Sequence, residues 1–241
     1  MIFLRYGQTF MDSNTYVIAD EHNREALVVD TGAGSAQWIR NMLATRGLKL
    51  GAVLLTHGHA DHVWDVSAVA GEAPVYIAAP DMYRLEDPLQ HLGMPELALG
   101  FSRMGIDRWA KPQNLQEIPP HAFTTSFEIV AGIWIRALST PGHTEGSCIF
   151  LLEGEVAQTD DPDSIPTSGR RETYMLSGDV LFAGSIGRTD LPGGDNDEMV
   201  ASLRLLVNVI HPSVQIYPGH GPQTNMFHET RHNEYLHAAM S

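Results

Sequence analysis

The sequence contains one cysteine, few basic residues and no long apolar run. A lone cysteine, Cys148, cannot form a disulfide within the chain, so nothing in the composition indicates an oxidising compartment. Only 15 Lys and Arg residues stand against 29 Asp and Glu residues, and the net charge of −14 at pH 7 disfavours binding to nucleic acid or to anionic membrane surfaces. No apolar stretch reaches the roughly 18 residues that a membrane span needs, and the first residues lack the basic and apolar regions of a signal peptide. We therefore expect a cytoplasmic globular protein.

The 241 residues include 43% hydrophobic residues, enough for one large domain, residues 1–241. Short runs rich in Val, Ile and Tyr predict strands in groups of two or three with helices between the groups, which favours an α/β (α+β) fold with mixed sheets. Strands are expected at residues 13–20, 26–30, 53–55, 75–77, 127–130, 133–138, 148–152, 174–176 and 214–217. Helices are expected at residues 35–46 with Ser35 as the cap, at 61–69, at 195–210 and from about 225. Residues 80–121 have weak periodicity and predict an insertion of short helices and loops, and residues 155–172 predict a long exposed loop.

Four potential metal ligands fall within the segment His57-Gly58-His59-Ala60-Asp61-His62, directly after a strand that is expected to be buried on both faces. Imidazole nitrogen and carboxylate oxygen suit zinc or iron. In an extended turn the two histidines of H-x-H point the same way, as a chelating pair does. The Asp-His pair follows where the chain turns into a helix and could serve a second ion. A solvated histidine-rich turn would need neither the buried approach strand nor this spacing, so we interpret the segment as a metal site.

Three further candidates share one design. His143, Asp179 and His220 each follow a strand and a glycine, and a glycine lets the backbone come close to its surroundings. Each of them alone is also typical of an ordinary turn. Loops at strand ends are, however, where such sheets place their sites. The three together therefore extend the predicted metal site.

The order Asp30, H-x-H-x-D-H at 57–62, His143, Asp179 and His220 resembles the motif order of the metallo-β-lactamase superfamily, over about residues 13–223. The resemblance implies an αββα sandwich of two mixed β-sheets flanked by helices. It also implies a binuclear metal centre along the shared edge of the sheets, with two divalent metal ions. Zinc is the expected metal, and iron and manganese are the alternatives.

The same resemblance divides the ligands between the two ions. The residues carried over are His57, His59 and His143 for the first ion, Asp61, His62 and His220 for the second, and Asp179 as the bridge between them. Asp30 is carried over as a residue that fixes the ligand loops by hydrogen bonds. The alternative for Asp30 is an aspartate that precedes a helix and has no link to the site.

Residues 177–195 and 217–224 look like the glyoxalase II-like branch, which hydrolyses thioesters such as S-D-lactoylglutathione. The implied partner is a small-molecule thioester. Two ions can lower the pKa of a shared water from 15.7 to about 7, so a metal-bound hydroxide would be available to attack the thioester carbonyl. Asp61 is the implied catalytic residue, which orients the nucleophile or takes its proton. Arg188 could contact an anionic substrate, and a salt bridge to a neighbouring Asp is the alternative.

Several functions remain open. The chain ends at residue 241, without the C-terminal helical domain that binds glutathione in larger glyoxalase II enzymes, and both predicted insertions bear on the substrate. The first alternative is a persulfide dioxygenase of the same fold, in which His57, His143 and Asp179 would hold a single iron. A lactonase, another ester hydrolase or a β-lactamase could use the same ligands. A metal-binding protein without turnover is a further alternative, and the chain is expected to be a monomer or a homodimer.

Two predictions concern residues outside the ligand set. Cys148 lies on an apolar strand and is expected to be a buried packing residue rather than a reactive thiol. The loop at 155–172 precedes the strand that delivers Asp179, so we expect it to leave the sheet at the end opposite the metals. Shortening that loop should then leave KM unchanged and shift stability only slightly.

Overall fold

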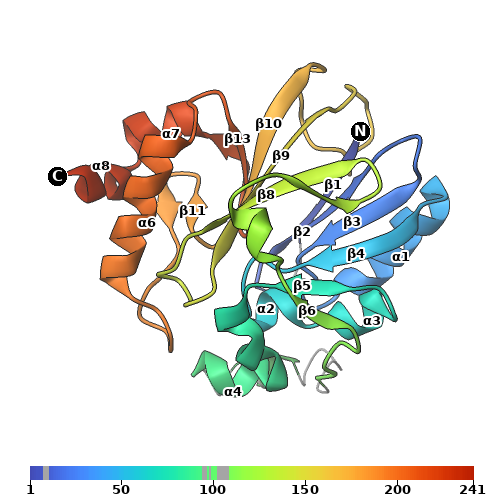
Figure 1. Ribbon diagram of the computed structural model, residues 1–241, viewed down its shortest axis with the longest axis horizontal. Helices are drawn as coiled ribbons and strands as arrows, with labels where there is room; N and C mark the ends of the chain where they lie inside the picture. Colours follow the sequence, from blue (N-terminus) through green and yellow to red (C-terminus); the bar gives the residue numbers. More distant parts are fainter. Residues whose placement is uncertain (8–10, 94–96, 98, 102–108) are drawn as a thin grey trace.

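Two mixed β-sheets pack face to face, and helices cover their outer faces (Figure 1). The computed structural model describes residues 1–7, 11–93, 97, 99–101 and 109–241. The expected αββα sandwich is confirmed, because the strands fall into two six-stranded sheets rather than one parallel sheet.

The first sheet contains antiparallel and parallel pairs. Its order is β1 (Ile2–Gly7), β2 (Asn14–Ala19), β3 (Glu25–Val29), β4 (Lys49–Leu54), β5 (Val75–Ile77) and β6 (Leu115–Glu117). The first three strands are antiparallel, and β3 to β6 are parallel. Neither β1 nor β6 is among the strands expected from the sequence.

The second sheet is mostly antiparallel. Its order is β14 (Thr224–Asn225), β13 (Gln215–Pro218), β10 (Arg171–Gly178), β9 (Cys148–Glu155), β8 (Ile133–Ser139) and β7 (Phe127–Val130). Only β10 and β13 are parallel neighbours in it. A small hairpin of β11 (Leu181–Phe182) and β12 (Ser185–Ile186) follows β10.

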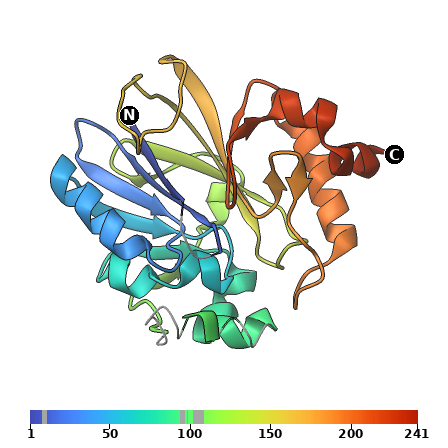
Figure 2. The same ribbon diagram turned by 180° about the vertical axis from the view of Figure 1, so that it is seen from behind.

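Three apolar layers hold the sandwich together. The layer between the sheets joins Leu27 of the first sheet to Phe150 of the second. The outer face of the first sheet packs against α1 (Ser35–Arg46) and α3 (Val66–Ala70), with Ile39 buried there. The outer face of the second sheet packs against α6 (Asn196–Val209), α7 (Met226–His232) and α8 (Glu234–Met240). Figures 1 and 2 show α1 and α6 on opposite outer sides of the molecule. Burial of these faces supplies the main driving force for the fold.

Two helix predictions are corrected. The helix expected at 61–69 is two short helices, α2 (Ala60–Val63) and α3, because the chain breaks at Asp65. The Asp65 carboxylate accepts hydrogen bonds from the N–H groups of Gly34 and Ala36, both at 2.9 Å, and so it caps α1 in place of Ser35. The C-terminal helix is likewise divided into α7 and α8 at Asn233, whose side chain caps α8.

The segment 80–121 contains the short helices that the sequence predicts, together with a strand that it does not predict. It contains most of the 3-10 helix η1 (Ala79–Glu86), then α4 (Pro88–Leu92), β6 and the 3-10 helix η2 (Pro120–Phe123). Because β6 pairs with β5, this segment completes the edge of the first sheet. The rest of the predicted insertion, residues 94–96, 98 and 102–108, lies outside the described residues.

The connection 156–170 is the loop that the sequence predicts, and many of its residues are exposed, but it is also anchored along the first sheet. The N–H of Ile165 donates to the carbonyl of Phe3 at 3.0 Å, and the N–H of Arg5 donates to the carbonyl of Asp163 at 2.8 Å, so the segment lies along β1. Ile165 is only 3% exposed. An apolar side chain in an otherwise polar loop thus anchors the loop to the core. The segment does leave the sheet at the start of β10, at the end opposite Asp179.

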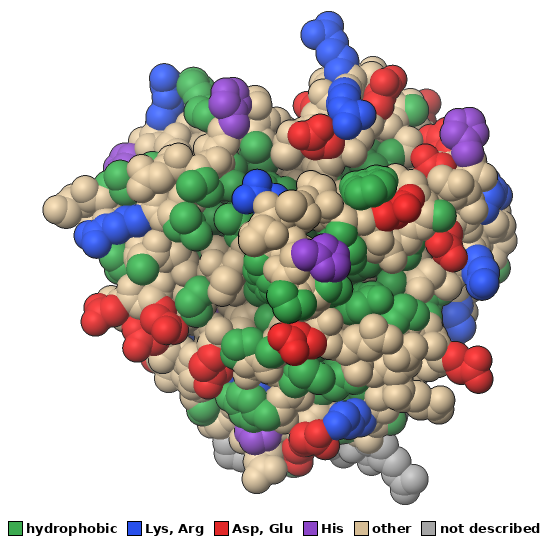
Figure 3. Space-filling model, in the orientation of Figure 1, with side chains coloured by type: hydrophobic (Ala, Val, Ile, Leu, Met, Phe, Trp, Pro, Cys, Tyr) green, Lys and Arg blue, Asp and Glu red, His purple; other side chains and the backbone are tan. Residues whose placement is uncertain are grey.

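The face of the molecule in Figure 3 carries acidic side chains without forming one charged patch. Figure 3 shows Asp and Glu side chains spread over the view and interspersed with Lys and Arg, and no extended basic patch is visible among the residues coloured there. None of the helices in the described part of the chain is long and apolar enough to span a membrane.

Candidate metal centre

The first ligand candidates lie where β4 ends and α2 begins. The turn after β4 carries His57 and His59, and His59 has extended backbone dihedral angles directly before the first helical residue. Asp61 and His62 lie within α2. All four side chains are buried, with exposed fractions between 0% and 8%. A buried strand followed by a short helix therefore places four polar side chains in the interior.

The remaining candidates come from the second sheet. His143 follows β8, Asp179 follows β10 directly, and His220 follows β13. A glycine precedes each of them, and the close approach that the sequence predicts is observed: a Cβ on Gly219 would lie 2.1 Å from Oδ1 of Asp179. The structure therefore brings all seven predicted ligands to one edge of the sandwich.

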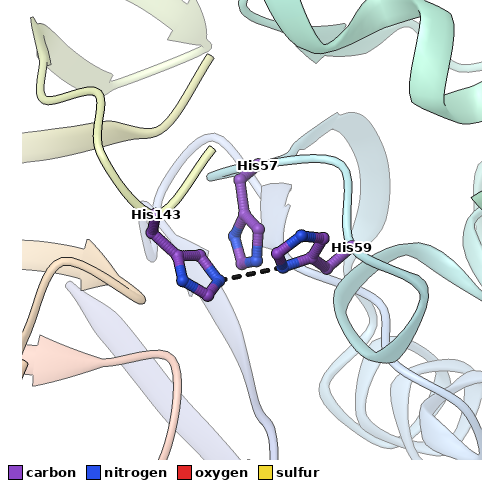
Figure 4. A group of neighbouring side chains, drawn as sticks. All are labelled: His57, His59 and His143. Atoms are coloured by element: carbon purple, nitrogen blue, oxygen red, sulfur yellow. Dashed lines mark hydrogen bonds between the residues drawn. The ribbon is translucent and has the colours of Figure 1, made fainter. Parts of the chain in front are cut away.

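The side chains form overlapping groups with metal-binding geometry. In Figure 4 the rings of His57, His59 and His143 converge from two loops. Within each group, the potential ligand atoms lie within 4.8 Å of one another. The three groups are His57, His59 and His143; Asp61, His62 and His220; and His57, His62 and Asp179.

The Asp179 carboxylate lies between the first two groups. Its Oδ2 is 3.5 Å from Nε2 of His143 and 3.3 Å from Nε2 of His220. Its Oδ1 is 3.3 Å from Nε2 of His62. One carboxylate thus faces histidines of both groups, which is the position that a bridging ligand requires.

The donor atoms of the site fit divalent cations. Nε2 of His57 and Oδ1 of Asp179 are buried, yet neither makes a hydrogen bond, and Nδ1 of His59 lies 2.9 Å from Nε2 of His143. Nε2 of His62 also faces Nε2 of His220 at 3.1 Å. Buried polar atoms are rarely left without a partner, and a cation at their centre satisfies such converging lone pairs. The site therefore has the donor chemistry of a zinc or iron centre.

Hydrogen bonds at the opposite ring nitrogens orient three of the histidines. Nδ1 of His62 donates to Oδ2 of Asp30 at 2.9 Å, and Nδ1 of His143 donates to the carbonyl of Arg188 at 2.7 Å. Nδ1 of His57 lies 3.0 Å from the hydroxyl of Thr56, which itself donates to Asp30. In each case Nε2 is left to face the site, which is the arrangement expected around metal-binding histidines.

Asp30 is placed as the family resemblance implies. Besides His62, it accepts a hydrogen bond from the backbone N–H of Thr56 at 2.8 Å. Its φ of 54° lies in the left-handed region, which is uncommon for residues other than glycine but tolerated by aspartate. Asp30 is therefore linked to the site through the residue that precedes the H-x-H turn.

Burial and charge set opposite protonation states within the site. Burial lowers the pKa values of His57 and His59 well below the usual range for histidine. Burial also opposes protonation of His62 and His220, but the Asp179 and Asp61 carboxylates outweigh it and raise these pKa values to about 9 and about 11. In the metal-free chain, protons on His62 and His220 thus neutralise the negative charge of the carboxylates. The metal ions are expected to take over this role.

A cavity of about 300 Å³ opens onto these groups. Five predicted ligands line it: His59, Asp61, His143, Asp179 and His220. Arg188 also lines it, and its guanidinium donates two hydrogen bonds, at 2.7 and 2.6 Å, to the Asp190 carboxylate. The structure thus contains the predicted salt bridge and also places Arg188 where a substrate could reach it.

The sequence reasoning missed two residues that hold the ligand loops. Asp81, in η1, is completely buried and hydrogen bonds to the loops of both His57 and His143. Asn14 donates from its side chain to the carbonyls of Pro218 and Gly221, at 2.9 and 3.0 Å, on either side of His220. Both are single polar residues without a motif, so the sequence contains no local signal for their partners.

Comparison with known proteins agrees with this geometry. The sequence profile of the metallo-beta-lactamase superfamily matches residues 9–220. The chain is 30% identical to the hydroxyacylglutathione hydrolase GloC of Haemophilus influenzae over 232 residues, which cover 95% of each protein.

Two solved structures are similar over nearly their whole length. The BLEG-1 B3 metallo-beta-lactamase has a TM-score of 0.73 and 28% identity, with 98% of this chain and 99% of that one covered. The protein TTHA1623 in a di-iron-bound form has a TM-score of 0.69 and 28% identity, with 96% and 98% covered. With the profile match extending over most of the sequence, the chain belongs to the metallo-beta-lactamase superfamily.

Proposed function

We propose that this metallo-hydrolase cleaves thioesters with the help of two divalent metal ions. The main evidence for this proposal is the position of Asp179. Its carboxylate lies within 3.5 Å of His143 on one side and within 3.3 Å of His220 on the other. A carboxylate that faces two complete groups of ligands suits a binuclear centre, whereas a mononuclear centre would leave one group without a cation.

The proposed ligands follow the observed groups. His57, His59 and His143 would hold one ion; Asp61, His62 and His220 would hold the other; and Asp179 would be shared. Imidazole and carboxylate donors suit zinc, and they also accept iron or manganese. The related TTHA1623 was solved in a di-iron-bound form, which supports two ions but leaves the metal to be measured.

The protein's own groups would orient and deprotonate the nucleophile. When bound, the two ions would polarise the thioester carbonyl and lower the pKa of water toward neutrality. Asp61 lines the cavity, and in the metal-free chain the charges of His62 and His220 lower its pKa to about 2 although burial opposes its ionisation. An ionised carboxylate at this position can accept the proton of an attacking water. The departing thiolate has a pKa of about 8.5 and needs little help from an acid.

The thioester is the proposed substrate because the related GloC is described as a hydroxyacylglutathione hydrolase. The mono-iron dioxygenase would use only His57, His143 and Asp179, and it would leave Asp61, His62 and His220 without a role. A lactone or β-lactam could bind to the same groups, so these substrates belong in the test.

A cytoplasmic location, and a monomeric or homodimeric state, remain part of the proposal.

Metal analysis combined with a substrate assay tests this function. Protein purified without added metal should contain close to two ions of zinc, iron or manganese per chain, and it should hydrolyse a thioester faster than a lactone or a β-lactam. Asp179→Asn should lose metal and activity together. A reproducible content of one iron per chain, together with oxygen consumption when glutathione persulfide is the substrate, would show that the protein is a dioxygenase and not a hydrolase.

A further inference from the structure

The cavity at the metal centre has a second, apolar wall. Besides the polar groups it is lined by Met11, Leu92, Leu97, Phe182 and Leu191. We call these five side chains the apolar wall. They come from four separate parts of the chain: the turn before β2, the α4 region, the hairpin β11–β12 and the loop that follows this hairpin. Neither metal binding nor proton transfer accounts for such a wall.

Part of the apolar wall is anchored in the core. Leu92 is 3% exposed and belongs to a buried cluster with Trp64 and Phe101, against which Leu97 and Leu191 pack. The end of α4 also closely approaches the loop that contains Leu191, because a Cβ on Gly93 would lie 2.9 Å from the ring of Pro192. These contacts fix the wall beside the ligands, so its shape is largely preformed.

Phe182 brings the apolar wall next to the ligands. Its ring lies edge-on to the ring of His220, with the centroids 6.0 Å apart and the planes at 88°. A hydrogen bond holds the hairpin that carries Phe182 in place: the buried carboxylate of Glu229 accepts it from the N–H of Gly184 at 2.9 Å. A group held at the polar end of the cavity would therefore have an aromatic surface beside it.

The charge of the cavity argues against a strongly anionic substrate. Among the described residues that line it, Arg188 is the one Lys or Arg side chain, and its guanidinium is already shared with Asp190. Glutathione carries two carboxylates that would need partners, and the chain as a whole carries a net charge of −14. Apart from the two metal ions of the proposed function, apolar contact rather than ion pairing is the main interaction that the side chains of this cavity offer.

We propose that the apolar wall binds the acyl group of the substrate. The substrate class would be thioesters of short or medium-length apolar acyl groups, on a thiol with little negative charge. This inference rests on the proposed function for the position of the scissile bond, but the preference for an apolar group can be measured without turnover.

Binding of thioethers, which cannot be hydrolysed, tests the wall directly. The S-ethyl, S-butyl and S-hexyl ethers of N-acetylcysteamine would be titrated by calorimetry into the zinc-loaded protein. Affinity should rise about fourfold for each added methylene until the cavity is full. S-hexylglutathione should bind no more tightly than the S-hexyl ether of N-acetylcysteamine. Equal affinities along the series, or binding at least tenfold tighter for the glutathione ether, would overturn the inference.

A variant pair locates the binding site of the alkyl group. Leu191→Asn changes the apolar wall at a partly buried loop position, and Leu205→Asn makes the same change on the exposed face of α6. With equal metal content, Leu191→Asn should weaken binding of the S-hexyl ether about tenfold, and Leu205→Asn should leave it unchanged. Equal binding of the S-hexyl ether to both variants would show that the apolar wall does not bind the alkyl group.

Turnover then separates the two proposals. Acetyl, butanoyl and hexanoyl thioesters of N-acetylcysteamine should show kcat/KM rising with chain length. Hydrolysis at one constant kcat/KM would keep the hydrolase and overturn the acyl preference. If no thioester is hydrolysed, the thioester function fails, while the thioether titrations still decide whether the wall binds apolar groups.

Discussion

Oδ2 of Asp81 accepts a hydrogen bond from the backbone N–H of Gly58 at 2.7 Å, in the middle of the H-x-H turn. Oδ1 of the same carboxylate accepts one from the N–H of Gly146 at 2.8 Å, in the loop that carries His143. Asp81 itself comes from η1, outside both loops. The relative placement of three imidazoles that we propose as metal ligands thus depends on a carboxylate that is not itself a predicted ligand.

Replacing Asp81 by Asn should weaken metal binding. An Asn side chain has only one acceptor oxygen, so its NH2 group would face the N–H of either Gly58 or Gly146, and one of the two loops would lose its hydrogen bond. We expect metal affinity to fall about 10- to 100-fold, as it does when residues that orient metal ligands are changed. The free energy of unfolding should fall by about 1–3 kcal/mol. Competition with a chelator and denaturant unfolding measure the two effects.

Asp20→Asn is the matched control for Asp81→Asn. Asp20 also accepts hydrogen bonds from two backbone N–H groups, those of His22 and Asn23, but it lies in an exposed turn. Both N–H groups bond to the same oxygen, Oδ1, which an Asn side chain retains, so the variant should lose little stability and keep the wild-type metal affinity. Equal metal affinity in both variants would show that Asp81 only stabilises the fold.

Asp30→Asn should affect the other group of ligands. Nδ1 of His62 donates to Oδ2 of Asp30, and the loss of the carboxylate charge weakens this bond. Asn tolerates the left-handed backbone at this position, so the variant should add little strain. Metal affinity should fall roughly tenfold or more. Asp160→Asn, an exposed change in the connection 156–170 away from the ligand loops, should bind metal like the wild type, and the same result for Asp30→Asn would contradict the role given to Asp30.

Sequence reasoning succeeded where the determinants are local. The segment 57–62 could be predicted because its ligands are neighbours in the chain, and strand ends bring the remaining ligands to one edge. The role of Asp81 could not be predicted, because its partners Gly58 and Gly146 lie 23 and 65 residues away. The predicted cap of α1 was wrong for the same reason. The local rule selects Ser35, whereas the capping carboxylate belongs to Asp65.

Asp61→Asn should lower kcat by about 10²-fold or more once the variant is fully loaded with metal. The expected loss is that of a group that transfers protons, and an amide cannot accept the proton that the Asp61 carboxylate would take. The pKa of Asp61, lowered to about 2, keeps the native carboxylate ionised at neutral pH. Steady-state kinetics with measured metal content, beside Asp197→Asn on the exposed first turn of α6 as control, decide the point. An unchanged kcat would remove Asp61 from the mechanism.

Cys148 should not react with thiol reagents in the folded protein. It is 2% exposed, and burial, with a smaller contribution from the charge of Asp81, raises the pKa of the thiol to about 12. The thiol is therefore both protonated at pH 8 and inaccessible. Ellman's reagent should titrate no thiol in the native chain and one in guanidinium chloride. Rapid labelling of the native protein would contradict this, and loss of activity on labelling would give Cys148 a part in the site.

The segment 156–170 should matter for stability and not for catalysis. Its backbone pairs with β1 through Arg5 and Phe3, and the hydroxyl of Tyr217 donates to the carbonyl of Pro166 at 3.1 Å. The side chain of Ile165 is buried between the sheets. The small loss of stability expected from the sequence therefore does not apply, because shortening the segment would remove core contacts and not merely loop length.

Ile165→Ala tests this by removing three buried side-chain carbons. Truncating a buried isoleucine leaves a cavity, so the free energy of unfolding should fall by about 2–5 kcal/mol. Asp160→Ala, an exposed change in the same segment, should cost less than about 0.5 kcal/mol. Both variants should keep the wild-type KM and metal content, because the segment leaves β10 at the end opposite Asp179. A several-fold change in KM for Ile165→Ala, measured where the variant is fully folded, would instead link this segment to the substrate cavity.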